Sequence, residues 1–192
     1  CLLLFQAHPL HWADQQKTNT LIKCLFEKNI EVFSQPLISR TIWELADVLE
    51  QDLLLKIVKY WLYSDSPALK QVAGELISGL LIIGEASLEL QQLWQETFDS
   101  RDLNFRRGVI YATCSGWYEN GKVRGNSHRK LMACLEDDAG GLAIAFSTLF
   151  FYHKTMPNDE LTHEIITWLA DNSSITAELD THRLFSCLVK LN

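Results

Sequence analysis

The sequence predicts an all-α protein on three observations. Apolar residues recur at intervals of three and four along nearly the whole chain, which is the spacing of one face of an α-helix. Helix-starting residues, chiefly Ser, Asp and Pro, stand just before several of these stretches. Nearly every segment follows this period rather than the alternation of a β-strand. We therefore expect about ten helices joined by short connections.

The predicted helices of the first half begin and end at local signals. Asp14 is placed to act as an N-cap. Thr41 with Glu44 matches a capping box, and Pro67 stands at a first helical position, where its missing N–H costs nothing. Gly84 is a natural C-terminal stop. These signals place helices over residues 1–7, 14–29, 41–49, 53–61 and 67–83.

The second half continues the same pattern. Ser87 is a candidate N-cap, and either Asn126 or Ser127 can cap a later helix. Two glycines at 140–141 separate that helix from a very apolar one, and Pro157 opens another. The apolar segment is well short of the roughly 20 residues that cross a bilayer, so we expect it to be buried in the protein. The predicted ranges are 87–98, 102–114, 127–135, 142–152, 157–169 and 181–191.

Length and composition indicate one globular domain. A chain of 192 residues with 47% hydrophobic and 21% charged residues can bury a sizeable core. Its five cysteines are odd in number, scattered and without a CxxC pair, which favours buried thiols in the cytoplasm over disulfides or a structural zinc. The chain starts at Cys1 without Met, so we expect residues 1–192 to be a single domain cut from a longer protein.

Positive charge is concentrated in residues 101–130. The chain has a formal net charge of −7, yet this stretch carries +5 and the remainder −12. The net charge argues against a protein that coats nucleic acid, whereas a local basic face on an acidic body is compatible with binding it. The basic residues of the stretch are Arg101, Arg106, Arg107, Lys122, Arg124, Arg129 and Lys130.

Two motifs in the chain come close to known sites but lack their chemistry. Residues 116–122 match the GxxxxGK pattern of a phosphate-binding loop. However, Val123 stands where a hydroxyl must reach magnesium, and Glu119 would repel a phosphate. His163 begins a near match to the zinc motif HExxH, but Thr167 replaces the second His. We expect no cofactor, no metal and no enzymatic activity.

An Asn120-Gly121 pair predicts a different structure for the near phosphate-binding loop. Asn-Gly favours a two-residue type I′ turn, so we expect a short loop or β-hairpin insertion near 116–125. Either this insertion packs its aromatic side chains on the helices, or it projects Trp117 and Tyr118 as an exposed finger.

An internal repeat lies within residues 65–115. In two segments an acidic residue precedes an apolar-basic pair, small residues and an aliphatic one. This order resembles the second-helix signature of HEAT repeats. The resemblance implies a right-handed α-α superhelix of stacked helical hairpins, in which Asp102 and Arg106 brace neighbouring repeats and Arg107 is free. An irregular helical bundle is the alternative. The pairs 36 residues apart are Leu69 and Phe105, Lys70 and Arg106, Ala73 and Val109, and Leu76 and Ala112.

These features favour a non-catalytic scaffold for protein–protein interaction over a nucleic-acid-binding protein. The partner would be another protein or another region of the parent chain, with no membrane involved. The alternative includes a DNA glycosylase of the HEAT-like, alkylation-repair type, which the segment 104–107 resembles, with Asp99 or Asp102 as the carboxylate. Convergence of the basic residues on one face would favour nucleic acid, and their use inside the fold would favour a scaffold. The candidate partner-binding residues are Arg107, Trp117, Tyr118, Lys122, Arg124, Arg129 and Lys130.

Overall fold

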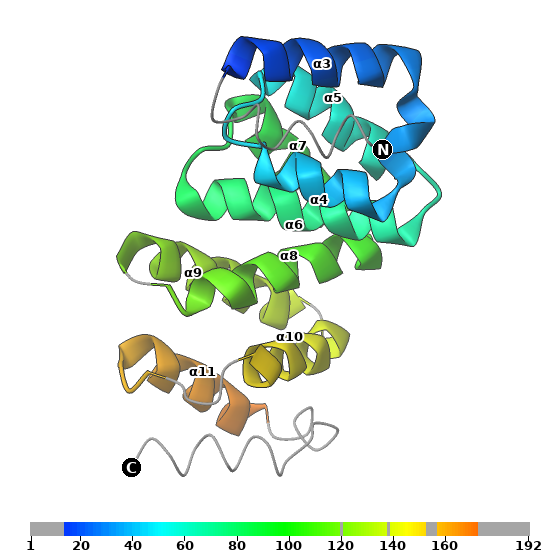
Figure 1. The fold of residues 1–192 in the computed structure, drawn as a ribbon. Helices are drawn as coiled ribbons and strands as arrows, with labels where there is room; N and C mark the ends of the chain where they lie inside the picture. Colours follow the sequence, from blue (N-terminus) through cyan, green and yellow to red (C-terminus); the bar gives the residue numbers. More distant parts are fainter. Residues whose placement is uncertain (1–13, 120, 138, 153–156, 173–192) are drawn as a thin grey trace.

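The computed structural model describes residues 14–119, 121–137, 139–152 and 157–172 (Figure 1). Over these ranges all regular secondary structure is helical and no strand is present. The all-α prediction is therefore confirmed for this part of the chain. The helices predicted over 1–7 and 181–191 lie outside the described residues.

The N-terminal part contains three α-helices and a 3₁₀ turn. Asp14 caps the first helix as predicted, because its carboxylate accepts a hydrogen bond from the backbone N–H of Lys17 at 3.0 Å. Pro36 begins the second helix, so Thr41 lies inside it and the predicted capping box with Glu44 is wrong. The elements are α3 (Gln15–Lys28), η1 (Ile30–Ser34), α4 (Pro36–Glu44) and α5 (Gln51–Leu62).

Asn19 of α3 fixes the turn between α4 and α5. Its side-chain amide donates to the carbonyl of Val48 at 2.8 Å, and its Oδ1 accepts from the backbone N–H of Glu50 at 2.7 Å. In the same region the buried Trp61 indole donates to the carbonyl of Phe33 at 2.8 Å. These bonds tie α3 to the turn before α5, and α5 to η1.

The next three helices begin where the sequence predicts. Pro67 is at the first turn of α6 (Pro67–Ile83), which ends at Gly84 in the left-handed conformation with φ of 88°. Ser87 caps α7 (Leu88–Asp99) by accepting from the backbone N–H of Leu90 at 3.3 Å. Asp102 caps α8 (Leu103–Trp117) by accepting from two backbone N–H groups of its first turn.

The last three described helices differ from the prediction at their starts. They are α9 (Gly121–Asp137), α10 (Ala139–Tyr152) and α11 (Glu160–Asp171). Asn126 and Ser127 lie inside α9 and do not cap it. The glycines at 140–141 are part of α10 rather than a break before it. Asp159, and not Pro157, begins the next helix, because its carboxylate accepts from the backbone N–H of Thr162.

The predicted β-hairpin near 116–125 is wrong. α8 continues to Trp117 and α9 starts at Gly121, so only a short connection separates two helices. Gly121 has a φ of 59°, which glycine adopts without strain. Gly121 of the Asn-Gly pair therefore begins a helix rather than a strand.

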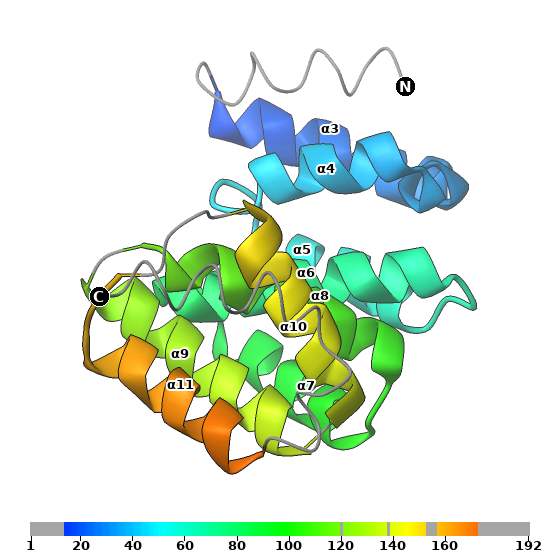
Figure 2. The same ribbon diagram turned by 90° about the horizontal axis from the view of Figure 1, so that it is seen from below.

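The helices α6, α8 and α10 lie one after another along the length of the molecule (Figure 1). α9 and α11 run side by side on one flank (Figure 2). α6 and α8 approach closely where Gly74 of α6 meets the backbone at Phe105 and Gly108 of α8 meets the backbone at Gln71. Small residues at these two positions allow the close approach that the repeat pattern implies.

One hydrophobic core runs through the described part of the chain. It extends from Ile22 in α3 to Leu169 in α11, and its largest fully buried side chains include Trp61, Trp117 and Phe105. Cys24, Cys114 and Cys134 are free thiols, the latter two buried in the core. Within the described residues, none of the helices combines the length and the apolar character needed to span a bilayer.

Candidate functional site

Arg106 is the most buried of the basic residues in the stretch 101–130. Its side chain is 5% exposed. The guanidinium donates to the carbonyl of Phe98 at 3.0 Å, stacks 4.5 Å from the centroid of the Phe98 ring and forms an ion pair with Asp137. Arg101 pairs with the same carboxylate at 3.2 Å, and both pairs hold the pKa of Asp137 below its ordinary value. Asp137 thus offsets one of these two positive charges: Arg106 is buried against it, whereas Arg101 stays exposed.

A second ion pair starts from the corresponding position two helices earlier, in α6. Lys70 of α6 donates to Asp102 at the start of α8 at 3.0 Å. Lys70 and Arg106 are 36 residues apart, and their partners Asp102 and Asp137 are 35 apart. Both basic residues therefore tie one helix to a carboxylate that lies later in the chain.

Asp102 gives this brace a defined dependence on pH. Partial burial alone would raise the pKa of Asp102, but the backbone amides of Phe105 and Asn104 and the ammonium of Lys70 together hold it below 3.8. A depressed folded pKa adds stability that is fully present above 3.8 and is lost as the pH falls through the folded value.

The variant Asp102→Asn tests that dependence, because Asn keeps the helix cap and removes the charge. We expect the urea midpoint of wild type to fall more steeply than that of Asp102→Asn as the pH decreases from 5 to 2 (about the range of carboxylate titration). Lys70→Met should reproduce part of this difference, since Lys70 supplies a hydrogen bond and a charge. Equal acid sensitivity of wild type and Asp102→Asn would contradict the assignment.

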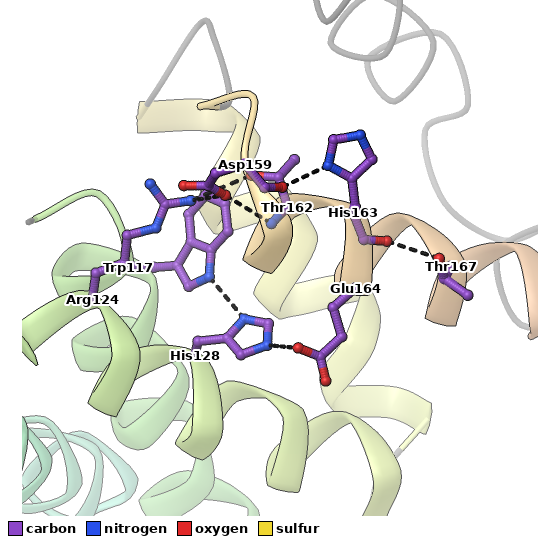
Figure 3. Close-up of polar contacts among 8 residues, drawn as sticks. All are labelled: Trp117, Arg124, His128, Asp159, Thr162, His163, Glu164 and Thr167. Carbon is purple, nitrogen blue, oxygen red and sulfur yellow. Dashed lines mark hydrogen bonds and ion pairs between the residues drawn. The ribbon is translucent and has the colours of Figure 1, made fainter. Parts of the chain in front are cut away.

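Trp117 and Arg124 are buried partners of each other, not members of an exposed finger (Figure 3). The Trp117 side chain is fully buried, and the Arg124 guanidinium stacks 4.3 Å from its ring centroid. Arg124 also donates to Asp159 at 2.8 Å and to the hydroxyl of Thr162 at 3.3 Å. Of the two alternatives for this segment, the exposed finger is therefore wrong for Trp117, because its side chain is buried among the helices.

A hydrogen-bonded chain from Trp117 to α11 completes this cluster (Figure 3). The indole N–H donates to Nδ1 of His128 at 3.2 Å, so the ring proton resides on Nε2, which donates to Glu164 at 2.8 Å. Glu164 and His163 both belong to the near match to HExxH, but they contact different residues. Glu164 accepts from His128, whereas the His163 ring contacts the carbonyl of Asp159 at 2.6 Å. Among the described residues no group of three potential metal ligands gathers.

The remaining candidates divide into half-buried and exposed side chains. The Tyr118 hydroxyl donates to the carbonyl of Leu149 at 3.2 Å. The Lys130 ammonium lies 3.9 Å from the ring centroid of Trp94, and burial lowers its pKa. Arg129 is exposed and donates to Asn126. Of the seven candidates, the exposed side chains are Arg107, Lys122 and Arg129.

The structure also contains a groove that sequence reasoning missed. It has a volume of about 1140 Å³ and is lined by α4 with the turn after it, by α6, and by the end of α8 with the start of α9. Two of its lining side chains are large, apolar and exposed: Trp43 is 46% exposed and Ile83 is 50% exposed. These are large apolar side chains at an open surface, which is typical of a binding site.

The groove is acidic, in contrast to the stretch 101–130. Five carboxylates and a single cation, Arg40, line it, for a formal charge of −4. Arg40 pairs with one of those carboxylates, Glu44, at 3.3 Å. Burial raises the pKa of Glu75, because its carboxyl group is partly removed from solvent. The signal for this site could not be read along the chain, since its residues come from segments far apart in sequence.

Comparisons of this chain with protein-family models, with curated proteins and with solved structures found no match.

Proposed function

We propose that residues 1–192 form a HEAT-like, right-handed superhelix of stacked helical hairpins that serves as a non-catalytic scaffold for protein–protein interaction. The repeated ion pairs Lys70–Asp102 and Arg106–Asp137 support this architecture. So does the succession of α6, α8 and α10 along the molecule (Figure 1). Repeat arrays of this kind bind partners on extended surfaces formed by several repeats.

The groove between α4, α6 and α8 is the observation that carries the proposal. Its exposed Trp43 and Ile83 offer an apolar anchor within a polar rim, the composition of a protein-binding surface. We propose that it receives a segment of a cytoplasmic protein or of another region of the parent chain.

Nucleic-acid binding is the second candidate and has weaker support. Four of the seven candidate residues are buried or half-buried, and Asp102, a proposed glycosylase carboxylate, is engaged as a helix cap and in an ion pair. The groove carries negative charge, which repels phosphate. What favours this candidate is the exposure of Arg107, Lys122 and Arg129.

Peptide selection tests the scaffold proposal. A random peptide library is selected on wild type and counter-selected on Ser115→Trp, which places a bulky side chain at an exposed position in the groove. We expect selected peptides to bind wild type and to bind Ser115→Trp at least about ten-fold more weakly. Gln92→Trp adds the same side chain at an exposed position of α7 outside the groove and should bind like wild type.

Two results would contradict the scaffold proposal. One is selected peptides that bind all three proteins equally. The other is the absence of peptide binding together with duplex binding in fluorescence anisotropy at about 50 mM salt that weakens on replacement of Arg107, Lys122 and Arg129 by Gln. That second result would establish the nucleic-acid candidate instead.

A further inference from the structure

We infer that the occupant of the groove is a basic amphipathic helix presented by another protein; this inference rests on the proposed function of the groove as a docking site. Four features of the groove support it, namely the negative charge of its lining, the burial of Glu75, its exposed apolar side chains and its length.

Four of the five carboxylates that line the groove form no ion pair within the described part of the chain, and the fifth, Glu44, pairs with Arg40. No ion pair joins Asp47, Glu75, Glu85 or Glu119 to a Lys, Arg or His among the described residues. They come from the turn after α4, from α6 and its end, and from the end of α8. Negative charge therefore surrounds the groove from three sides, and a partner that carries Lys or Arg complements it.

Glu75 is the carboxylate that a bound cation would affect most. It lies half-buried in the middle of α6, on the groove lining, and accepts no hydrogen bond from the described residues. Burial of a carboxyl group without a partner is unfavourable, and the raised pKa of Glu75 records that cost. A Lys or Arg side chain entering the groove would supply the missing donor and charge.

Trp43 and Ile83 provide the apolar half of the recognition. Trp43 packs against α6 at Gly79, where an added Cβ would lie 3.3 Å from Cζ2 of the indole. The glycine lets the ring lie against the helix while 46% of the side chain stays exposed. Trp is the side chain most often found at the energetic centre of an interface, and its face also attracts Lys and Arg.

The dimensions fit a helix of about three turns. The α6 residues that line the groove run from Val72 to Ile83, a rise of about 17 Å at 1.5 Å per residue. The described residues offer no strand edge to which an extended peptide could add, so the helix-in-groove mode applies.

Binding of designed peptides to the 192-residue chain tests the inference. Three fluorescein-labelled peptides share one helical pattern of Leu at i, i+3, i+4 and i+7, and carry Lys and Arg, Gln, or Glu at the other positions. We expect the basic peptide to bind about ten-fold more tightly than the Gln peptide and the Glu peptide to bind more weakly still. A fourth peptide with the basic composition but scattered Leu residues should lose most of the affinity, because it presents no apolar face.

Two groove variants and one matched control locate the binding. Glu75→Gln keeps the shape of the side chain and should weaken the basic peptide about ten-fold while leaving the Gln peptide unchanged. Trp43→Ala should weaken both peptides. Glu96→Gln removes the same charge from an exposed position of α7 outside the groove and should have no effect.

The outcomes separate this inference from the function on which it rests. Equal binding of the three patterned peptides, lost on Ser115→Trp, would overturn the basic partner and keep the scaffold. A dimer of the chain in analytical ultracentrifugation that Ser115→Trp makes monomeric would overturn it in favour of a second copy as occupant. If no peptide, designed or selected, binds in the groove, the inference and the scaffold proposal both fail.

Discussion

Replacement of Gly108 by Ala is expected to lower the free energy of unfolding by about 3 kcal/mol, the upper end of the usual cost of overpacking. A Cβ at Gly108 would lie 2.5 Å from the backbone N of Glu75 and closer still to the carbonyl of Gln71. Both atoms belong to the backbone of α6, so no side-chain rotation relieves the contact. The helices α6 and α8 must move apart, which is measured as a lower urea midpoint by far-UV circular dichroism.

Gly125→Ala is the matched control for this effect. Gly125 lies in the interior of α9, and an added Cβ there meets nothing within 4 Å. Ala is favoured over Gly in a helix, so the control should raise the free energy of unfolding by about 0.4–1 kcal/mol. Opposite signs for the two Gly→Ala changes would establish the close contact of α6 and α8. A Gly108→Ala protein as stable as wild type would refute it.

Helix starts were predictable where the signal and the group it satisfies are neighbours in sequence. Asp14, Ser87 and Asp102 each accept hydrogen bonds from backbone N–H groups two or three residues later. Pro67 fixes its own backbone angle at the first turn. Such signals depend on local geometry alone, and the packing of the rest of the chain does not change them.

Sequence signals that allow a helix break or cap without requiring it led to wrong predictions. Glycine tolerates a break in a helix, yet the residues at 140–141 continue α10. Asn126 has the side chain of an N-cap, but its amide donates to the carbonyl of Ile82, 44 residues away, at 2.8 Å. At Asn126 a contact across the fold decides the role of the side chain, and a single sequence carries no direct trace of that contact.

The same reason explains what was predictable about the candidate site. The 36-residue repeat indicated the role of Arg106, since its pattern places a basic residue at the same point of two helices. The groove escaped notice, because Trp43, Glu75 and Glu119 are far apart in the chain and meet only after folding. Counting charges along the chain finds the basic stretch 101–130. The same count cannot find the acidic groove, because its carboxylates come from several separate segments.

Arg106→Met should lower the free energy of unfolding by about 2 kcal/mol, the second largest effect expected here. Met fills much of the same volume but loses the charged hydrogen bond to the carbonyl of Phe98 and the stacking on its ring. Asp137 also loses a partner, although it stays partly exposed and keeps Arg101 at 3.2 Å. We therefore expect less than the full cost of an isolated buried charge, measured as a shift of the urea midpoint.

Arg107→Met separates the contacts of Arg106 from the effect of removing one positive charge. Arg107 is the next residue of α8 and is exposed, and it has no hydrogen bond or ion pair among the described residues. Its replacement changes the net charge by the same amount and should alter the free energy of unfolding by no more than about 0.5 kcal/mol. Equal effects of the two variants would mean that Arg106 acts only through its charge. A difference of the expected size would show that the basic residue at this position stabilises the fold through its contacts. Those contacts tie its helix to a carboxylate later in the chain, as Lys70 does with Asp102.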